Sequence, residues 1–190
     1  MPLAVRMQNA PVGITIPYGP ERDAHRHNHG FIDTRGHPER AASIAEGIGS
    51  AEMRALLAAL AAPGAPVFSV ACDLGAYQAA NAPAERREVA GGYLQLMLAG
   101  YARADLAAYM KLAEHIAAGL RQRAGTQVWD VTFLLKTVRF NLDGFNGDAP
   151  SLDIWFQALA PKPKAALAAR ERLLRGLGGL LRPEAMAALN

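Results

Sequence analysis

The sequence lacks the features that identify several common protein classes. Its 190 residues include one cysteine, Cys72, which excludes an internal disulfide and fits a reducing compartment. No apolar run approaches the roughly eighteen residues of a membrane-spanning helix. The first residues lack a basic start followed by an apolar stretch, so they do not predict a secretory signal. We therefore expect a cytoplasmic protein with no membrane segment.

Motifs that accompany common catalytic chemistry are also missing. The sequence contains no GxSxG nucleophile motif, no phosphate-binding glycine loop and no dinucleotide-binding fingerprint. Cys72 and His115 are the one pair that suggests a nucleophile and a base, but Cys72 lies in an apolar segment, where a cysteine is usually an inert small hydrophobe. These absences favour a non-catalytic protein. Which cofactor or small-molecule ligand the protein binds, if it binds one, is unknown from the sequence.

The composition is that of a globular protein. Hydrophobic residues make up 51% of the chain and charged residues 19%, a balance that predicts a folded core rather than disorder. The formal net charge is only +3. An excess this small does not by itself predict binding to nucleic acid.

The N-terminal part differs from the rest of the chain. Four prolines fall within the first twenty residues, and only residues 12–16 alternate as a short strand does. The residues that follow, up to 37, are polar and charged without a period. We expect residues 1–37 to form a poorly ordered arm and residues 38–190 to form a single domain.

Within residues 38–190 the patterns predict an α+β fold in which helices dominate. A small antiparallel sheet of about three strands, covered by helices, is the packing that this order of elements favours. Because residues 128–142 also satisfy a helical heptad, an all-α bundle is the alternative. The segments predicted to be helical are 38–49, 51–62, 88–123 and 165–181, and the predicted strands are 67–77, 128–142 and 152–159, with residues 143–150 as a hairpin loop.

The segment 88–123 carries the longest helical pattern, and its two halves present apolar faces in different directions. We expect a break between Gly100 and Asp105, with Asp105 capping a second helix. A small sheet covers only one of the two faces well. Because the other face would remain uncovered in a single chain, we expect a homo-oligomer. We expect it to be a two-fold dimer whose interface includes residues from Tyr93 to Tyr109.

The sharpest local motif is a histidine cluster. His25, His27 and His29 alternate, so in an extended segment their imidazoles lie on one side, with Asp33 and His37 nearby. Three imidazoles suit zinc, copper, iron or nickel. The motif predicts a metal site at these three histidines, and a solvated histidine-rich loop is the alternative.

A second group of possible ligands lies in the predicted hairpin loop and at the start of the strand that follows it. Carboxylate and amide oxygens could bind calcium, but their spacing is not that of the twelve-residue calcium loop, and a tight turn uses the same residue types. The group consists of Asp143, Asn146, Asp148 and Asp153.

The third candidate is a basic C-terminal helix. Its cations could face phosphates, but no aromatic residues lie between them, as single-strand binders normally require. A solvated helix face is the simpler interpretation. The basic residues are Lys162, Lys164, Arg170, Arg172, Arg175 and Arg182.

The sequence thus favours a non-catalytic protein that acts through self-association or through binding of a partner or ligand. A small metal-dependent enzyme that uses His25, His27 and His29 is the first alternative. A nucleic-acid-binding module that uses the basic helix is the second.

Overall fold

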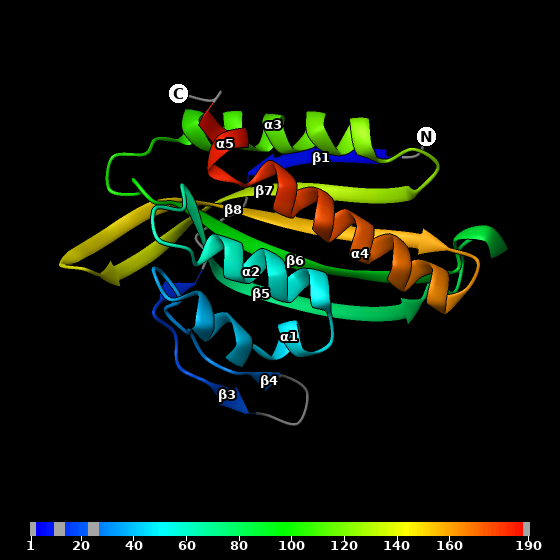
Figure 1. Ribbon diagram of the computed structural model, residues 1–190, viewed down its shortest axis with the longest axis horizontal. Coiled ribbons are helices and arrows are strands. Elements are labelled where there is room, and N and C mark those ends of the chain that lie inside the picture. Colours follow the sequence, from blue (N-terminus) through cyan, green and yellow to red (C-terminus); the bar gives the residue numbers. More distant parts are fainter. Residues whose placement is uncertain (1–2, 10–13, 23–26, 188–190) are drawn as a thin grey trace.

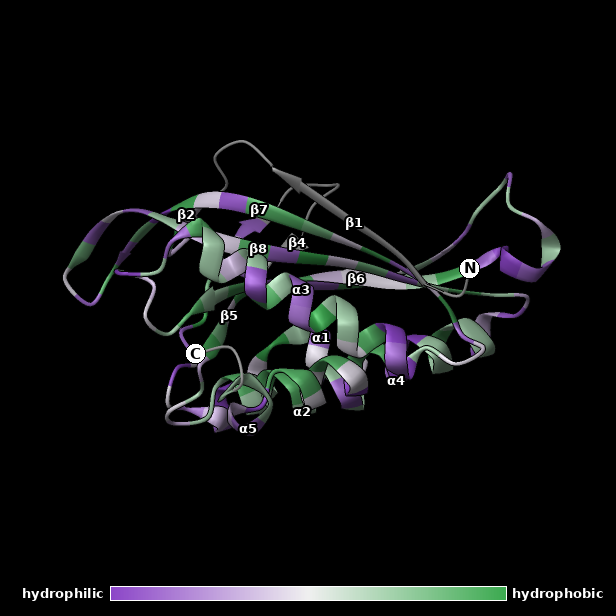
Figure 2. Ribbon diagram, turned by 90° about the horizontal axis from the view of Figure 1, so that it is seen from above, coloured by the Kyte–Doolittle hydropathy of each residue, from purple (hydrophilic) through white to green (hydrophobic). Residues whose placement is uncertain are grey.

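A long, mixed sheet forms the centre of the molecule, and helices cover one of its faces (Figures 1 and 2). The computed structural model describes residues 3–9, 14–22 and 27–187, and of residues 3–9, 22, 27 and 28 it describes the backbone alone. The strands follow the order β1-β7-β8-β6-β5, and β2 lies beside β7. β1 and β2 run parallel to β7, whereas the other pairs are antiparallel. The strands of this sheet are β1 (Leu3–Asn9), β2 (Thr15–Ile16), β5 (Val67–Gln78), β6 (Glu88–Leu98), β7 (Val128–Leu142) and β8 (Phe145–Ala160). Two further strands, β3 (Glu21–Arg22) and β4 (His27–Asn28), pair with each other.

Three helices pack on one face of the sheet and close the main core. Two of them begin where the sequence predicts, because Ser50 Oγ accepts a hydrogen bond from the Met53 amide (3.0 Å) and Asp105 Oδ1 accepts one from the Ala108 amide (2.9 Å). These helices are α2 (Ala51–Leu60), α3 (Leu106–Arg123) and α4 (Pro163–Leu180). The shorter helical elements are η1 (Pro38–Ser43) and α1 (Ala45–Ile48) before α2, η2 (Ala84–Arg86) between β5 and β6, and α5 (Pro183–Met186) after α4. Among the described residues no helix is both long enough and apolar enough to cross a bilayer.

The predicted fold, a three-stranded sheet under dominant helices, is wrong, and so is the all-helical alternative. Residues 88–98 form the interior strand β6 instead of a helix. The apolar spacing of four that suggested a helix also keeps residues on one face of a strand, because four is a multiple of the strand period. Gly91 and Gly92 fit the strand, since a Cβ at these positions would meet neighbouring carbonyl oxygens at 2.5 and 2.1 Å. β1, which no periodic signal marked, adds a further strand.

The hairpin of β7 and β8 is confirmed, although its turn is shorter than predicted. Asp143 and Gly144 form the turn with positive φ angles of 56° and 75°, and β8 begins directly after them. The alternating runs that predict these two strands also predict that both tryptophans are protected from water. This is correct for Trp129, whose Nε1 donates to the Ala169 carbonyl at 3.1 Å, and wrong for Trp155, which is 45% exposed.

A second, smaller core lies on the sheet face opposite the helices. Side chains alternate between the two faces of a strand, so Met97 and Phe140 point away from the helical layer. Residues from the N-terminal part, among them Ile16, cover them. The expectation that residues 1–37 form a poorly ordered arm stays a prediction. The buried members of this core are Ile16, Phe68, Val70, Met97, Val138, Phe140 and Ala149.

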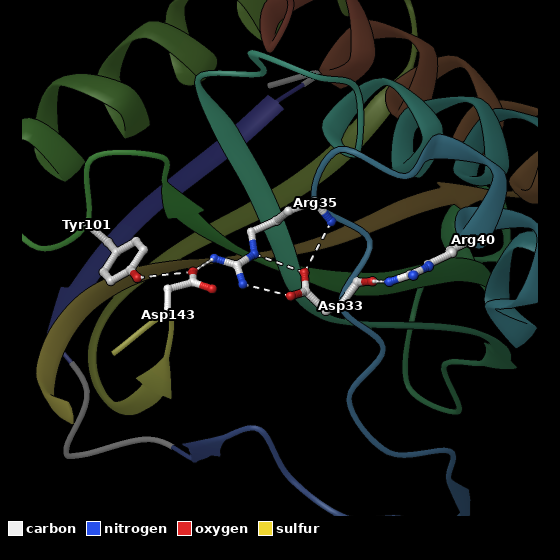
Figure 3. A network of polar contacts seen from close by, with 5 residues as sticks. All are labelled: Asp33, Arg35, Arg40, Tyr101 and Asp143. Atoms are coloured by element: carbon white, nitrogen blue, oxygen red, sulfur yellow. Dashed lines mark hydrogen bonds and ion pairs between the residues drawn. The ribbon is translucent and has the colours of Figure 1, made fainter. Parts of the chain in front are cut away.

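Arg35 joins the segment before η1 to the β7–β8 turn (Figure 3). Its guanidinium donates to both carboxylate oxygens of Asp33, at 2.9 and 2.7 Å, and to Asp143 at 2.5 Å. It also lies 5.2 Å from the centre of the Phe68 ring. The hydrogen bonds from Arg35 hold the pKa of Asp33 below its usual range.

Candidate functional site

An aromatic pair stands on the sheet face that the helices do not cover. Leu94, Phe133 and Phe156 belong to the core beneath the helices, so the alternate residues of the same strands face the other way. Tyr93 of β6 and Trp155 of β8 are direct register partners there. Their rings are stacked, with centroids 4.9 Å apart and planes inclined by 24°. Because Trp155 is 45% exposed, this pair offers a flat apolar surface to solvent.

On one side of the aromatic pair, glycines leave space above the sheet because they have no side chains. Gly75 and Gly91 are register partners on β5 and β6, and a Cβ at Gly75 would meet nothing within 4 Å. A cavity of about 250 Å³ lies above them, bordered by Tyr77 and Gln157, whose side chains are joined by a hydrogen bond of 2.9 Å. Tyr93 and Trp155 line this cavity as well.

A larger cavity, of about 780 Å³, lies on the other side of the pair. Its walls are the edge strand β5, residues 14–21 and 29–32, and the start of α1. The register of β5 shifts at Val70, and the Tyr18 hydroxyl donates to the Val70 carbonyl at 3.1 Å. Since Asp73, Tyr93 and Trp155 line both cavities, the two adjoin and form one concave region, which we call the groove.

Carboxylates from three elements border the larger cavity. They are Glu21 of β3, Glu46 of α1 and Asp73 of β5, and among the described residues that line either cavity there is no lysine or arginine. The protein as a whole carries a net charge of +3. The lining of the groove is therefore opposite in sign to the protein's average.

Three weak acids of the larger cavity hold their protons at neutral pH. Burial, followed by the charges of Cys72 and Glu46, raises the pKa of Tyr18 to about 12. Burial also raises the pKa of Tyr93, and burial together with Glu46 and Asp73 raises that of Cys72. The Cys72 thiol donates to Glu46 Oε2, with the sulfur and the oxygen 3.9 Å apart. A thiol in this environment is a poor nucleophile.

Buried polar groups continue from the groove along the same face. Gln95 Nε2 donates to Ser151 Oγ at 2.9 Å, and Lys136 Nζ pairs with Asp153 Oδ2. Asp153 is 1% exposed, and burial raises its pKa, although Lys136 and the Trp155 indole act to lower it. Within the described part of the chain, Asp153 Oδ1 has no hydrogen bond of normal geometry.

The predicted metal site is only partly within the described residues. His25 and the side chain of His27 lie outside them, whereas His29 is exposed and borders the larger cavity. The described residues contain no group of three or more metal-binding side chains. The metal site at His25, His27 and His29 stays a prediction.

The acidic residues of the β7–β8 hairpin do not come together as ligands. Asp143 pairs with Arg35, while Arg139 contacts Asp148 (3.4 Å) and Asn146 (3.1 Å). Asp153 is buried at the other ion pair described above. These contacts support the turn interpretation rather than a calcium site.

The other sequence candidates are also separated. Cys72 contacts Glu46, whereas His115 Nε2 lies 3.0 Å from the Leu180 carbonyl at the end of α4, so they do not form a catalytic pair. On the basic helix, Arg170 is buried beside Glu171, and Arg175 pairs with Glu52. The face that nucleic acid would need therefore has fewer free cations than its sequence suggested.

The groove itself was not predicted. Tyr93 was assigned to a helix, and Trp155 was expected to be buried. The sequence feature that could have located the groove is the alternation of β8, which puts Asp153, Trp155 and Gln157 on one face of the strand. Alternation alone does not say which face of a sheet remains uncovered.

Comparison of the chain with protein-family models, with characterised proteins and with solved structures finds no match in any of the three.

Proposed function

We propose that this protein is a non-catalytic, cytoplasmic binding protein that holds an organic ligand in the groove over Tyr93 and Trp155. The observation that carries the proposal is the exposed, stacked pair that lines two adjoining cavities. Ligand sites are typically concave, rich in aromatic surface and fitted with a few polar groups that orient the ligand. The cavity of about 780 Å³ is within the range of such sites.

The protonation states of three groove residues argue against their use as nucleophiles or bases. A side chain that reacts as an anion without a neighbouring base needs a pKa near the working pH or below it. The pKa values of Tyr18, Tyr93 and Cys72 are all raised, so these groups serve as fixed hydrogen-bond partners and not as reactive anions.

Screening of a fragment library by ligand-observed NMR tests the proposal. We expect aromatic and aliphatic fragments to bind the wild type and to lose binding in Trp155→Leu. Leu106→Ala is the matched control, because Leu106 is a similarly exposed apolar residue (45%) that lines neither cavity. Equal binding to all three proteins, or binding to none, would contradict a ligand site at the groove.

One observation keeps a metal-dependent function as the second candidate. His29, a member of the predicted metal cluster, borders the same cavity. Zinc titration of the wild type and of a His27→Ala, His29→Ala double variant separates the two candidates. Tighter zinc binding by the wild type, accompanied by hydrolytic activity, would favour the metal-dependent enzyme.

Self-association stays part of the proposal, and the edge strand β5 is a further candidate surface for it. Tyr109 is fully buried, and its hydroxyl accepts from the Leu98 amide at 3.0 Å, so Tyr109 itself cannot contribute to the predicted interface, which otherwise stays a prediction. Within the described chain β5 pairs with one strand only, and its end, Asp73–Gln78, is largely exposed. We expect a dimer to pair through this edge. Sedimentation of the wild type, compared with that of Ala76→Pro, measures whether a dimer forms through this edge.

A further inference from the structure

We infer that the ligand of the groove is a small organic ammonium ion, held over the Trp155–Tyr93 pair and surrounded by the carboxylates of Glu21, Glu46 and Asp73. This inference rests on the proposed function and narrows it to one class of ligand.

The aromatic pair is the first part of the argument. The face of an aromatic ring carries partial negative charge and attracts cations, and indole does so most strongly. Trp155 stacks against Tyr93 on one side yet remains 45% exposed. A cation that enters either cavity therefore meets an indole that the sheet already holds in place.

The charge of the cavity is the second part. Glu21, Glu46 and Asp73 come from three separate elements, so their convergence is not a consequence of neighbouring sequence positions. Glu46 Oε2 lies 3.9 Å from the Cys72 thiol and Asp73 is the next residue in the chain, so both carboxylates stand at the same wall of the cavity. In a partly buried space the field of these carboxylates favours a cation and opposes an anion.

The directions in which the Tyr18 hydroxyl and the Cys72 thiol donate their hydrogens are the third part. The Tyr18 hydroxyl donates its hydrogen to the Val70 carbonyl, so its oxygen lone pairs remain as acceptors beside the cavity. The Cys72 thiol likewise directs its hydrogen toward Glu46. The cavity wall thus presents acceptors, which match the N–H groups of a primary ammonium or the polarised methyl groups of a quaternary one.

The test compares two probes of the same shape. Choline and 3,3-dimethylbutan-1-ol differ in whether a positively charged nitrogen or a neutral carbon carries the three methyl groups. We expect choline to bind the full-length protein about tenfold more tightly or better, in line with a cation–π contribution of this order. Binding is followed by tryptophan fluorescence and by calorimetry. A capped lysine, N-acetyl-lysine methylamide, shows whether the cation of a protein side chain is accepted as well as a free one.

Charge-removing variants distinguish the possible outcomes. Glu46→Gln and Asp73→Asn should each weaken choline binding several-fold and leave binding of the neutral alcohol unaffected. Glu21→Gln is a third test, and because Glu21 is exposed this variant carries little risk to the fold. Equal affinity for both probes, or no effect of the three variants, would overturn the ammonium assignment while the groove remains a ligand site. Failure of choline, the alcohol and the neutral aromatic indole to bind would instead count against the proposed function.

Discussion

Arg35 Nη1 lies 2.5 Å from Asp143 Oδ2, although 108 residues separate the two in the sequence. The Arg35 side chain is 22% exposed and also contacts Asp33 and the Phe68 ring. One side chain thus connects the segment before η1, the β7–β8 turn and the second core. This segment leads into α1, which contributes Glu46 to the groove.

Arg35→Ala should therefore lower the free energy of unfolding by about 1–2 kcal/mol, the sum of partly exposed ion pairs and a cation–π contact. For a chain of this size each kcal/mol corresponds to a fall in Tm of about 2–4 °C, which calorimetry resolves. Arg139→Ala is the control, because its ion pair with Asp148 is exposed on both sides. A loss in Arg139→Ala equal to that in Arg35→Ala would show that surface charge and not the joined contacts sets the effect.

Local signals of the sequence predicted some elements and not others. The starts of α2 and α3 were predictable, because the capping side chains of Ser50 and Asp105 act on amides three residues away. The β7–β8 hairpin was visible for the same reason, since its pairing is local. β6 was not predicted, because the spacing of its apolar residues fits both the helix period and the strand period. The close approach of β5 and β8 to Gly91 and Gly92 is what favours the strand. The groove depends on contacts between distant segments, such as Tyr18 with Val70, which no local pattern contains.

Two glycines on facing helices predict opposite responses to alanine. A Cβ at Gly119 of α3 would lie 2.1 Å from Leu180 Cδ2, whereas a Cβ at Gly179 of α4 would meet nothing within 4 Å. Gly119→Ala should destabilise the protein by about 1–3 kcal/mol through overpacking. Gly179→Ala should stabilise it by about 0.5–1 kcal/mol through helix propensity. Urea unfolding of both variants measures the difference, and a stabilising Gly119→Ala would mean that α3 and α4 do not pack as described.

Cys72 should react slowly with alkylating reagents. Burial and the neighbouring Glu46 raise the pKa of its thiol, so at pH 8 the thiolate fraction falls below that of an ordinary cysteine with a pKa of about 8.5. Iodoacetamide should modify the folded protein much more slowly than the urea-unfolded chain. Glu46→Gln should accelerate the reaction, because the removal of a nearby negative charge lowers the pKa of the thiol. Unchanged rates in Glu46→Gln would indicate that access alone limits the reaction.

The ion pair of Lys136 and Asp153 gives the strongest expected effect on stability. Asp153 is 1% exposed, so Lys136→Met leaves a buried carboxylate without its cation. Removal of one partner from a buried pair typically costs about 3–5 kcal/mol at neutral pH. Lys136→Met with Asp153→Leu removes both charges and should recover most of this loss, because a buried pair replaced by apolar groups is often neutral.

The pH dependence separates this mechanism from simple loss of packing. Burial already raises the pKa of Asp153, and without Lys136 less opposes that rise, so the folded pKa lies further above the unfolded value of about 3.9. The folded state then binds more protons than the unfolded state in this window, and the free energy of unfolding increases as the pH falls. The deficit of Lys136→Met relative to the wild type should therefore shrink from pH 7 toward pH 4, as urea unfolding at each pH can measure. A deficit that stays constant over this range would show that the unpaired charge of Asp153 does not cause the loss of stability.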